Sequence, residues 1–201
     1  QLSQKEKEIC SSGALLNIPD GARLVGIIGR LHEIKGHKYF IEAAAKLIHQ
    51  GQNYHFLIVG DGDLKAELEQ LVAKLGIPEH VKFLGHVDNV APIYHELDAL
   101  VIASDIEGGP GVLLEAMACD CVIVSTNTIG LKSVVEGEPF VVFVPPKDSD
   151  AIASALKEVL DDEAALRKKQ AIAGKASKKF DVSGTITQFQ NYYQQLALEN
   201  K

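Results

Sequence analysis

Short apolar runs alternate six times with segments whose apolar residues recur at helical spacing. The runs cover residues 24–28, 55–59, 81–84, 99–103, 121–125 and 140–144. A strand that is apolar at every position, and not only at every second one, is buried on both faces, as in a parallel sheet covered by helices. The alternation therefore predicts an α/β fold built on a doubly wound parallel sheet of about six strands.

The segments between the runs carry helical stripes, and these set the expected domain organisation. Apolar residues recur every three or four positions within 37–49, 64–75, 90–97 and 152–160. We expect a helical lead-in over residues 1–20 and one domain over residues 21–201, with trailing C-terminal helices over about 166–180 and 186–196. Since the chain starts with Gln1 and its only methionine is Met117, we expect it to be part of a longer protein.

Charge and composition exclude several classes of protein. The chain has 20 Lys and Arg against 27 Asp and Glu, a net charge of −7, which argues against nucleic acid as a partner. No apolar run approaches the roughly 18–20 residues that span a bilayer. Three cysteines, an odd number, point to a reducing compartment and hence to the cytoplasm. Because the net charge is negative, any site that binds an anion must be a local cluster of cations.

Two cations follow the first apolar run. In open α/β sheets, ligands bind beyond the carboxyl ends of the strands. The sequence there is Gly-Arg-Leu-His-Glu-Ile-Lys-Gly, which places Arg30 and Lys35 just before a predicted helix. A guanidinium, an ammonium and free N–H groups at a helix start suit a phosphate. The alternative is that both are surface cations.

A glycine cluster follows the fourth apolar run. Gly108, Gly109 and Gly111 surround a proline that suits the first position of a helix, and glycines let backbone approach a ligand closely. Glu107 lies in this loop and Glu115 lies in the helix after it. Two carboxylates at such an edge suit the hydroxyl groups of a sugar. The alternative is that Glu107 caps the helix and Glu115 is a solvated helix residue.

Taken together, these motifs resemble a known family over nearly the whole chain. They are G-R-L-x-x-x-K-G over 29–36, E-G-x-P-x-V-L-L-E-A-M-A over 107–118, F-L-G-x-V over 83–87 and V-G-x-G over 59–62. In order and spacing they are similar to the C-terminal, donor-binding domain of a GT-B-fold glycosyltransferase of family 4. The resemblance implies a Rossmann-like domain that forms one half of a GT-B fold.

The resemblance also implies roles for single residues. It makes Arg30, Lys35 and Glu107 catalytic: the two cations bind the diphosphate of the donor and stabilise the leaving nucleotide, and Glu107 holds sugar hydroxyls. It assigns the ribose hydroxyls to Glu115. The remaining donor-binding residues would act through backbone near the sugar, the phosphate and, for Val87, the base: Gly29, Val87, Gly108, Gly109, Gly111 and Val112.

The implied reaction is transfer of a sugar from a nucleoside diphosphate (UDP, GDP or ADP) to an acceptor hydroxyl, with retention at the anomeric carbon. The family resemblance implies no metal and no other cofactor. It implies a further partner, an N-terminal domain that binds the acceptor and is absent from this chain. By analogy with the family, we expect a lipid-linked acceptor at the cytoplasmic face of the membrane.

Five positions depart from the family pattern. Gly109 and Gly111 stand where larger side chains are usual, which puts the choice of donor sugar in doubt. Asp120 replaces a glycine at a helix end, so we expect it to adopt left-handed backbone geometry. Val122 replaces a proline, and Ser133 stands where the family has a carboxylate.

Two other hypotheses remain open at this stage. An NAD(P)-dependent oxidoreductase shares the fold class, but Lys65 stands where G-x-G-x-x-G, read from Gly60, needs a third glycine. A non-enzymatic, flavodoxin-like regulatory module needs an acidic cluster after the first and third strands. The sequence has Gly29-Arg30 and Gly85-His86 at those places.

Overall fold

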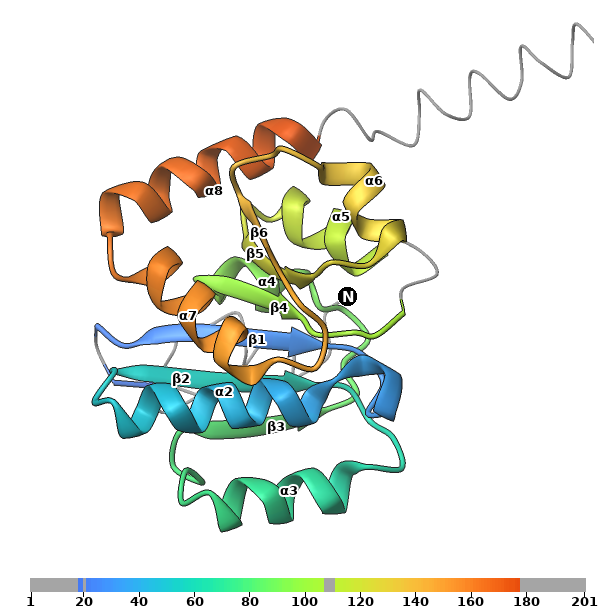
Figure 1. The fold of residues 1–201 in the computed structure, drawn as a ribbon, viewed down its shortest axis with the longest axis vertical. Helices are drawn as coiled ribbons and strands as arrows, with labels where there is room; N and C mark the ends of the chain where they lie inside the picture. Colours follow the sequence, from blue (N-terminus) through green and yellow to red (C-terminus); the bar gives the residue numbers. More distant parts are fainter. Residues whose placement is uncertain (1–17, 20, 107–110, 178–201) are drawn as a thin grey trace, which may run out of the picture.

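Six parallel strands form a sheet in the order β3-β2-β1-β4-β5-β6 (Figure 1). The computed structural model describes residues 18, 19, 21–106 and 111–177. The strands are β1 (Arg23–Ile28), β2 (Tyr54–Val59), β3 (Val81–Gly85), β4 (Ala99–Ile102), β5 (Val122–Thr126) and β6 (Val141–Val144). Each begins and ends within one residue of the predicted run, which confirms the predicted fold class.

The strand order has a functional consequence. The chain starts in the middle of the sheet, moves outward to β3, then returns and continues from β4 to β6 on the other side of β1. This is the Rossmann order, and the flavodoxin-like order 2-1-3-4-5 differs from it. The topology therefore contradicts the regulatory-module hypothesis. It also places the reversal point, where ligands bind in such sheets, between β1 and β4.

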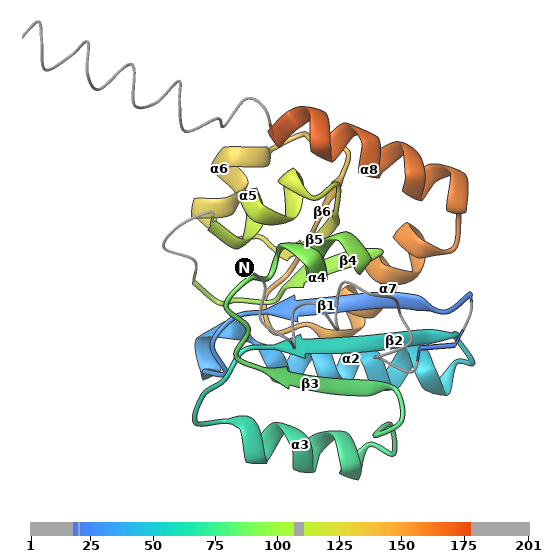
Figure 2. The ribbon, with the colours of Figure 1, turned by 180° about the vertical axis from the view of Figure 1, so that it is seen from behind.

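Helices cover both faces of the sheet (Figures 1 and 2). Apolar side chains of α2 (His37–His49), α3 (Lys65–Lys74) and α7 (Ser149–Leu160) pack on one face. Those of α4 (Ala91–Glu96), α5 (Gly111–Ala118) and α6 (Ile129–Val135) pack on the other. A short 3₁₀ turn, η2 (Glu33–Lys35), precedes α2. The sequence did not predict η2 or α6, and both are short.

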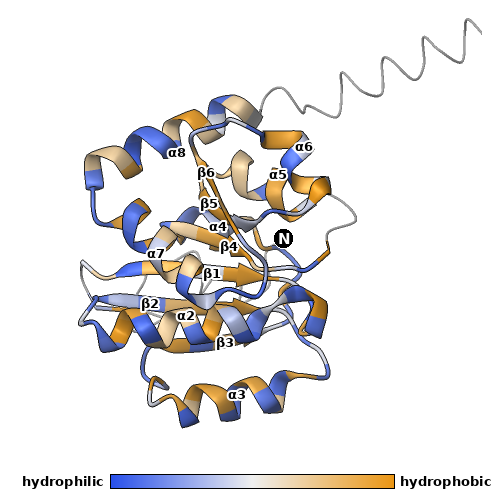
Figure 3. Cartoon of the chain, viewed as in Figure 1, coloured by the Kyte–Doolittle hydropathy of each residue, from blue (hydrophilic) through white to orange (hydrophobic). Residues whose placement is uncertain are grey.

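Alternate residues of each central strand enter two separate cores. In β2, Phe56 and Ile58 join the core under α2, α3 and α7, whereas Leu57 and Val59 join the core under α4, α5 and α6. This explains the continuous apolar runs, since most side chains of a central strand are buried on one face or the other. Figure 3 shows hydrophobic strands enclosed by helices whose outer sides are hydrophilic.

The last described helix, α8 (Glu163–Ser177), crosses from one face to the other. Leu166 near its start lies in the first core, and Ala173 near its end lies in the second. The side chain of Arg23 at the start of β1 binds Asp98 (3.2 Å) and Glu163 of α8. The first predicted trailing helix is thus confirmed up to residue 177.

The second trailing helix and residues 1–17 of the lead-in lie outside the described residues. Within the described part of the chain, no helix is both long and apolar enough to cross a membrane.

Candidate functional site

The two segments singled out from the sequence follow neighbouring strands. Residues 29–36 follow β1 and residues 103–115 follow β4, and these strands pair in parallel. Their carboxyl ends flank the reversal point of the strand order. The fold therefore places Arg30 and Lys35 at the same edge of the sheet as the start of α5.

Backbone hydrogen bonds fix the loop that carries Arg30. The N–H of Gly29 donates to the carbonyl of Val59 (2.9 Å), and the N–H of Leu31 donates to that of Asp61 (3.0 Å). The side chain of Leu31 is fully buried, whereas Arg30 between these anchors is exposed. The loop is thus held in place while its guanidinium points away from the core.

Gly36 brings the other end of this loop against β4. Its φ is +68°, and a Cβ at this position would lie 2.1 Å from the carbonyl oxygen of Ala103. Only glycine allows both the left-handed backbone and this close approach. Lys35, the residue before it, is half-buried and shares a small cavity of about 10 Å³ with Ser104 and Val112 (the Lys35 cavity).

A larger cavity lies beside Arg30. It has a volume of about 360 Å³ and is lined by residues at or just after the ends of β1, β2 and β3 (the Arg30 cavity): Ile28, Gly29, Arg30, Val59, Gly60, Asp61, His86, Val87 and Val90. The fold thus brings three predicted donor-binding residues together. Asp61 and His86 also line this cavity, although the sequence pattern did not single them out. The Nε2 atom of His86 lies 3.1 Å from Asp88 Oδ1.

Glu115 is held by a buried tyrosine. The hydroxyl of Tyr94 on α4 donates to Glu115 Oε2 on α5, with an oxygen to oxygen distance of 3.0 Å. Tyr94 is 1% exposed, and burial together with the Glu115 charge raises the pKa of its hydroxyl, so the proton remains available to donate. Glu115 is exposed, but its carboxylate is held in place. The sequence did not reveal this contact, because Tyr94 fits the apolar stripe of a helix, which predicts only packing in the core.

Part of the predicted site lies outside the described residues. Glu107, Gly108 and Gly109 belong to that part. Gly111 is the exposed first residue of α5, and a Cβ built on it would contact no other element of the described part of the chain within 4 Å. The loop after β4 is fixed just before residue 107: the buried hydroxyl of Thr126, at the end of β5, donates to the carbonyl oxygen of Ser104 at 2.5 Å.

The departures from the family pattern have local explanations. Asp120 has φ +58°, which confirms the predicted left-handed geometry. Gly174 of α8 faces it: a Cβ on Gly174 would lie 1.7 Å from Asp120 Oδ1. Val122 is a buried first residue of β5. The hydroxyl of Ser133 donates to the carbonyl of Gly130 (3.2 Å) within α6 and so has a local partner.

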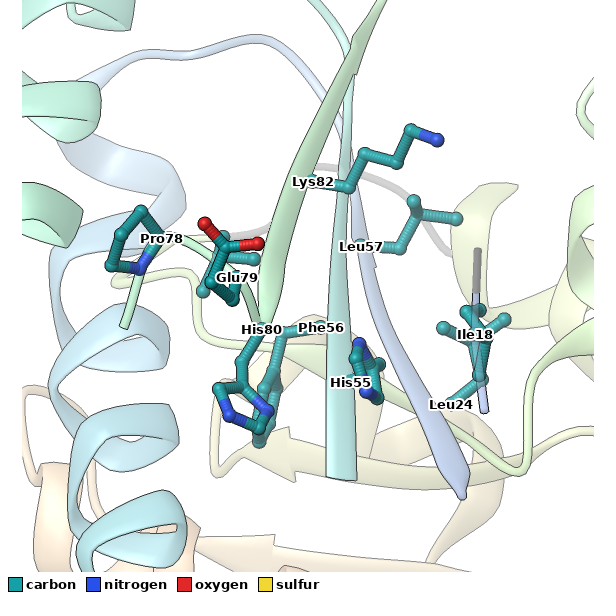
Figure 4. A pocket seen from close by; sticks show the side chains of 10 residues that line it. Ile18, Leu24, His55, Phe56, Leu57, Pro78, Glu79, His80 and Lys82 are labelled. Atoms are coloured by element: carbon teal, nitrogen blue, oxygen red, sulfur yellow. The ribbon is translucent and has the colours of Figure 1, made fainter. Parts of the chain in front are cut away.

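A separate cavity of about 220 Å³ lies at the opposite edge, beside the starts of β1, β2 and β3 (Figure 4). The rings of His55 and His80 have centroids 5.1 Å apart there. Burial and the proximity of His80 lower the pKa of His55. Two imidazoles are too few for a metal, and no group of three or more His, Cys, Asp or Glu suited to a metal ion occurs among residues 18, 19, 21–106 and 111–177.

Comparison with known proteins gives a family. The model of the family described as "Glycosyl transferases group 1" matches residues 14–180. The chain is 38% identical, over 80% of its length, to the "GalNAc-alpha-(1->4)-GalNAc-alpha-(1->3)-diNAcBac-PP-undecaprenol alpha-1,4-N-acetyl-D-galactosaminyltransferase" of Campylobacter jejuni. It is 30% identical, over 89% of its length, to the alpha-D-kanosaminyltransferase of Streptomyces kanamyceticus. The chain covers only 45% and 47% of these two relatives.

Solved structures agree on the fold. The C-terminal domain of a group 1 family glycosyl transferase (LpcC) from Francisella tularensis superposes with a TM-score of 0.72 at 27% identity, covering 78% of this chain and 85% of that one. Anabaena Alr3699/HepE in complex with UDP and glucose superposes with a TM-score of 0.84 at 24% identity, covering 94% of this chain and 52% of that one.

The family match covers both strand-end motifs and bears out the resemblance seen in the sequence. It also decides against the oxidoreductase hypothesis, which the strand order alone leaves open because dinucleotide-binding domains share that order. The chain belongs to the group 1 glycosyl transferases.

Proposed function

We propose that this chain is the donor-binding part of a retaining glycosyltransferase and that it binds a nucleoside-diphosphate sugar over the carboxyl ends of β1 and β4. The observation that carries the proposal is the position of Arg30 and Lys35. Both follow β1, next to the reversal point of the strand order, and Lys35 shares a small cavity with Val112 in the first turn of α5. In a chain of net charge −7, these cations lie where the fold class binds anions.

The proposed chemistry is stabilisation of a leaving group. As the bond from the anomeric carbon to the diphosphate oxygen breaks, negative charge grows on the diphosphate. The oxygen of the acceptor hydroxyl forms the new bond on the same face of the sugar, and its proton passes to the departing diphosphate oxygen. Arg30 and Lys35 are cations held close to that charge, so they stabilise it more in the transition state than in the ground state. In this proposal the two side chains fulfil the role that a metal ion has in other transferases.

The two glutamates orient the donor. Glu115 offers the ribose hydroxyls a carboxylate that Tyr94 already holds through one oxygen. Glu107, outside the described residues, remains assigned to the sugar hydroxyls by the family motif alone. Val87 lines the Arg30 cavity, which supports a position near the base. Gly111 and Val112 begin α5, where backbone N–H groups suit an anion.

The partners of the whole protein follow by the same reasoning. The relatives are more than twice as long as their matched segments, which supports a second, acceptor-binding domain. The Campylobacter relative is named for a substrate linked to PP-undecaprenol. This name supports a lipid-linked acceptor and hence work at the cytoplasmic face of a membrane. The complex of Anabaena Alr3699/HepE with UDP makes UDP the first nucleotide to test.

Calorimetric titration tests the proposal. We expect at least one of UDP, GDP, ADP and their sugar derivatives to bind, and EDTA to leave the affinity unchanged. Lys35→Ala removes a charge-assisted contact of about 1.5–3 kcal/mol, so it should weaken binding about ten- to hundredfold. Lys74→Ala, at an exposed cation in the last turn of α3, is the matched control. No binding by any nucleotide, or equal affinity in both variants, contradicts the proposal.

A further inference from the structure

A third cavity opens at the carboxyl edge, on the face covered by α2 and α3. Its volume is about 290 Å³, and it lies between η2, the start of α2, α3 and the turns after β4 and β6 (the Asp105 cavity). It shares His37 with the Lys35 cavity and no residue with the Arg30 cavity. Small-molecule sites begin at about this volume, which exceeds the space that one or two ordered waters need.

His37, the first residue of α2, lines this cavity with two unused polar atoms. The residue is 2% exposed, and neither ring nitrogen has a hydrogen-bond partner among the described residues. Burial and the charge of Lys35 lower the pKa of His37 to about 4, so the ring is neutral at neutral pH. A neutral imidazole offers one donor and one acceptor. Buried polar groups are nearly always satisfied, so a group that both donates and accepts fits here.

Asp105 adds a third unused atom to the same cavity. Its backbone N–H donates to the carbonyl of Ile34 in η2 (2.8 Å), which fixes the residue beside the start of α2. Its Oδ2 lies 3.0 Å from Lys147 Nζ, whereas the buried Oδ1 has no partner in the described part of the chain. The ion pair cancels the charge of the carboxylate but leaves Oδ1 as an acceptor.

The charges of the lining select an uncharged ligand. An anion would meet Asp105 Oδ1 together with the carboxylates of Glu33 and Glu67, which also line the cavity. A cation would be repelled by the charge of Lys147, which lines the cavity, and by that of Lys35, which lies close enough to His37 to lower its pKa. A hydroxyl group satisfies the unused atoms without charge, because it donates to a carboxylate oxygen and both donates to and accepts from an imidazole.

We propose that the Asp105 cavity binds a neutral saccharide through its hydroxyl groups, with Asp105 and His37 as the recognising side chains. The inference rests on the proposed function for the source of the saccharide, which is a sugar unit of the acceptor substrate that the second domain presents to this edge of the sheet. Because the cavity shares no residue with the Arg30 cavity and only His37 with the Lys35 cavity, we expect the saccharide to bind together with the nucleotide and not to compete with it.

Nuclear magnetic resonance on the whole chain tests this site. The probes are the α-methyl glycosides of glucose, galactose, N-acetylglucosamine and N-acetylgalactosamine, added at millimolar levels with saturating UDP. We expect at least one glycoside to shift the ring signals of His37 and to bind about tenfold more weakly to Asp105→Ala and His37→Phe. Asp105→Ala keeps its UDP affinity, and Glu69→Ala, an exposed carboxylate on α3 outside the cavity lining, keeps both affinities.

The outcomes separate the two proposals. If UDP binds but no glycoside does, or if glycoside binding is equal in wild type and both variants, the cavity holds only ordered water and the saccharide site is refuted. If UDP fails to bind, the proposed function fails, and the glycoside titrations still decide the saccharide site. His37→Phe is used only if its circular dichroism spectrum matches that of wild type. If it does not, Asp105→Ala alone decides whether the saccharide site exists.

Discussion

Gly36→Ala tests whether a backbone contact holds Lys35 at the carboxyl edge. The backbone of Gly36 is left-handed, with φ +68°, and an added Cβ would lie 2.1 Å from the carbonyl oxygen of Ala103. The left-handed geometry costs an L residue about 1–2 kcal/mol. Overpacking of a close contact adds about 1–3 kcal/mol. We therefore expect the free energy of unfolding to fall by about 2–5 kcal/mol.

Gly51→Ala is the matched control, because it carries the conformational cost without the contact. Gly51 has φ +81°, and among the residues that the structure describes, apart from its chain neighbours, no atom lies within 4 Å of a Cβ built on it. Its loss should be about 1–2 kcal/mol, which is the conformational cost alone. Urea denaturation followed by circular dichroism gives both values. Equal losses in the two variants would refute the idea that the loop is packed against β4.

The same two variants link stability to binding. Gly36→Ala pushes the loop away from Ala103 and so moves Lys35, whereas Gly51→Ala changes a turn after α2 and leaves Lys35 in place. We expect the UDP affinity to fall in Gly36→Ala and to stay within about twofold of wild type in Gly51→Ala, a difference of less than about 0.5 kcal/mol. An unchanged affinity in a folded Gly36→Ala protein would show that the position of Lys35 does not depend on this contact.

Three further predictions concern single side chains. Tyr94→Phe removes the donor that holds Glu115, so UDP affinity should fall about three- to tenfold in calorimetry, and an unchanged affinity would mean that this anchor is irrelevant to the nucleotide. Asp120→Gly relieves left-handed strain and should raise the free energy of unfolding by about 0.5–1 kcal/mol in urea; a loss would mean that the carboxylate stabilises α8. His37 has a folded pKa of about 4 against 6.5 unfolded, so below pH 6.5 the unfolded chain takes up a proton that the folded chain does not. Stability should therefore fall by up to about 1.4 kcal/mol per pH unit between pH 6.5 and 4, and His37→Phe should flatten this slope in urea denaturation at pH 7 and 5; equal slopes would contradict the assignment.

The strands were predictable because burial on both faces leaves few polar positions in them. In β2, all four residues from Phe56 to Val59 are buried, two in each core, so the run stands out without any knowledge of pairing. The helix α6 left no comparable signal. It has only seven residues, and its first residue, Ile129, is 91% exposed, so apolar residues do not form a clean stripe.

The site was predictable where it depends on strand order and unpredictable where it depends on packing. Arg30 and Lys35 could be placed at the carboxyl edge because any residue that follows a parallel strand lies there. The hydrogen bond from Tyr94 to Glu115 depends on how α4 packs beside α5. The burial of the His37 ring, which has no hydrogen-bond partner among the described residues, depends on how η2, α3 and the turns after β4 and β6 meet around the start of α2. Such contacts leave no pattern in the sequence. The roles of Arg30 and Lys35 in catalysis remain predictions.

The crossing of α8 has a consequence for how the domain is made. Arg23 is in the first strand, whereas its partner Glu163 is 140 residues later in the chain. During synthesis, β1 therefore leaves the ribosome long before the helix that fastens it across the sheet. Contacts at such large sequence separation form slowly, so the docking of α8 is expected to be a late step of folding. Interactions that form late affect the rate of unfolding more than the rate of folding, so we expect loss of the Arg23–Glu163 ion pair to speed the opening of the finished domain.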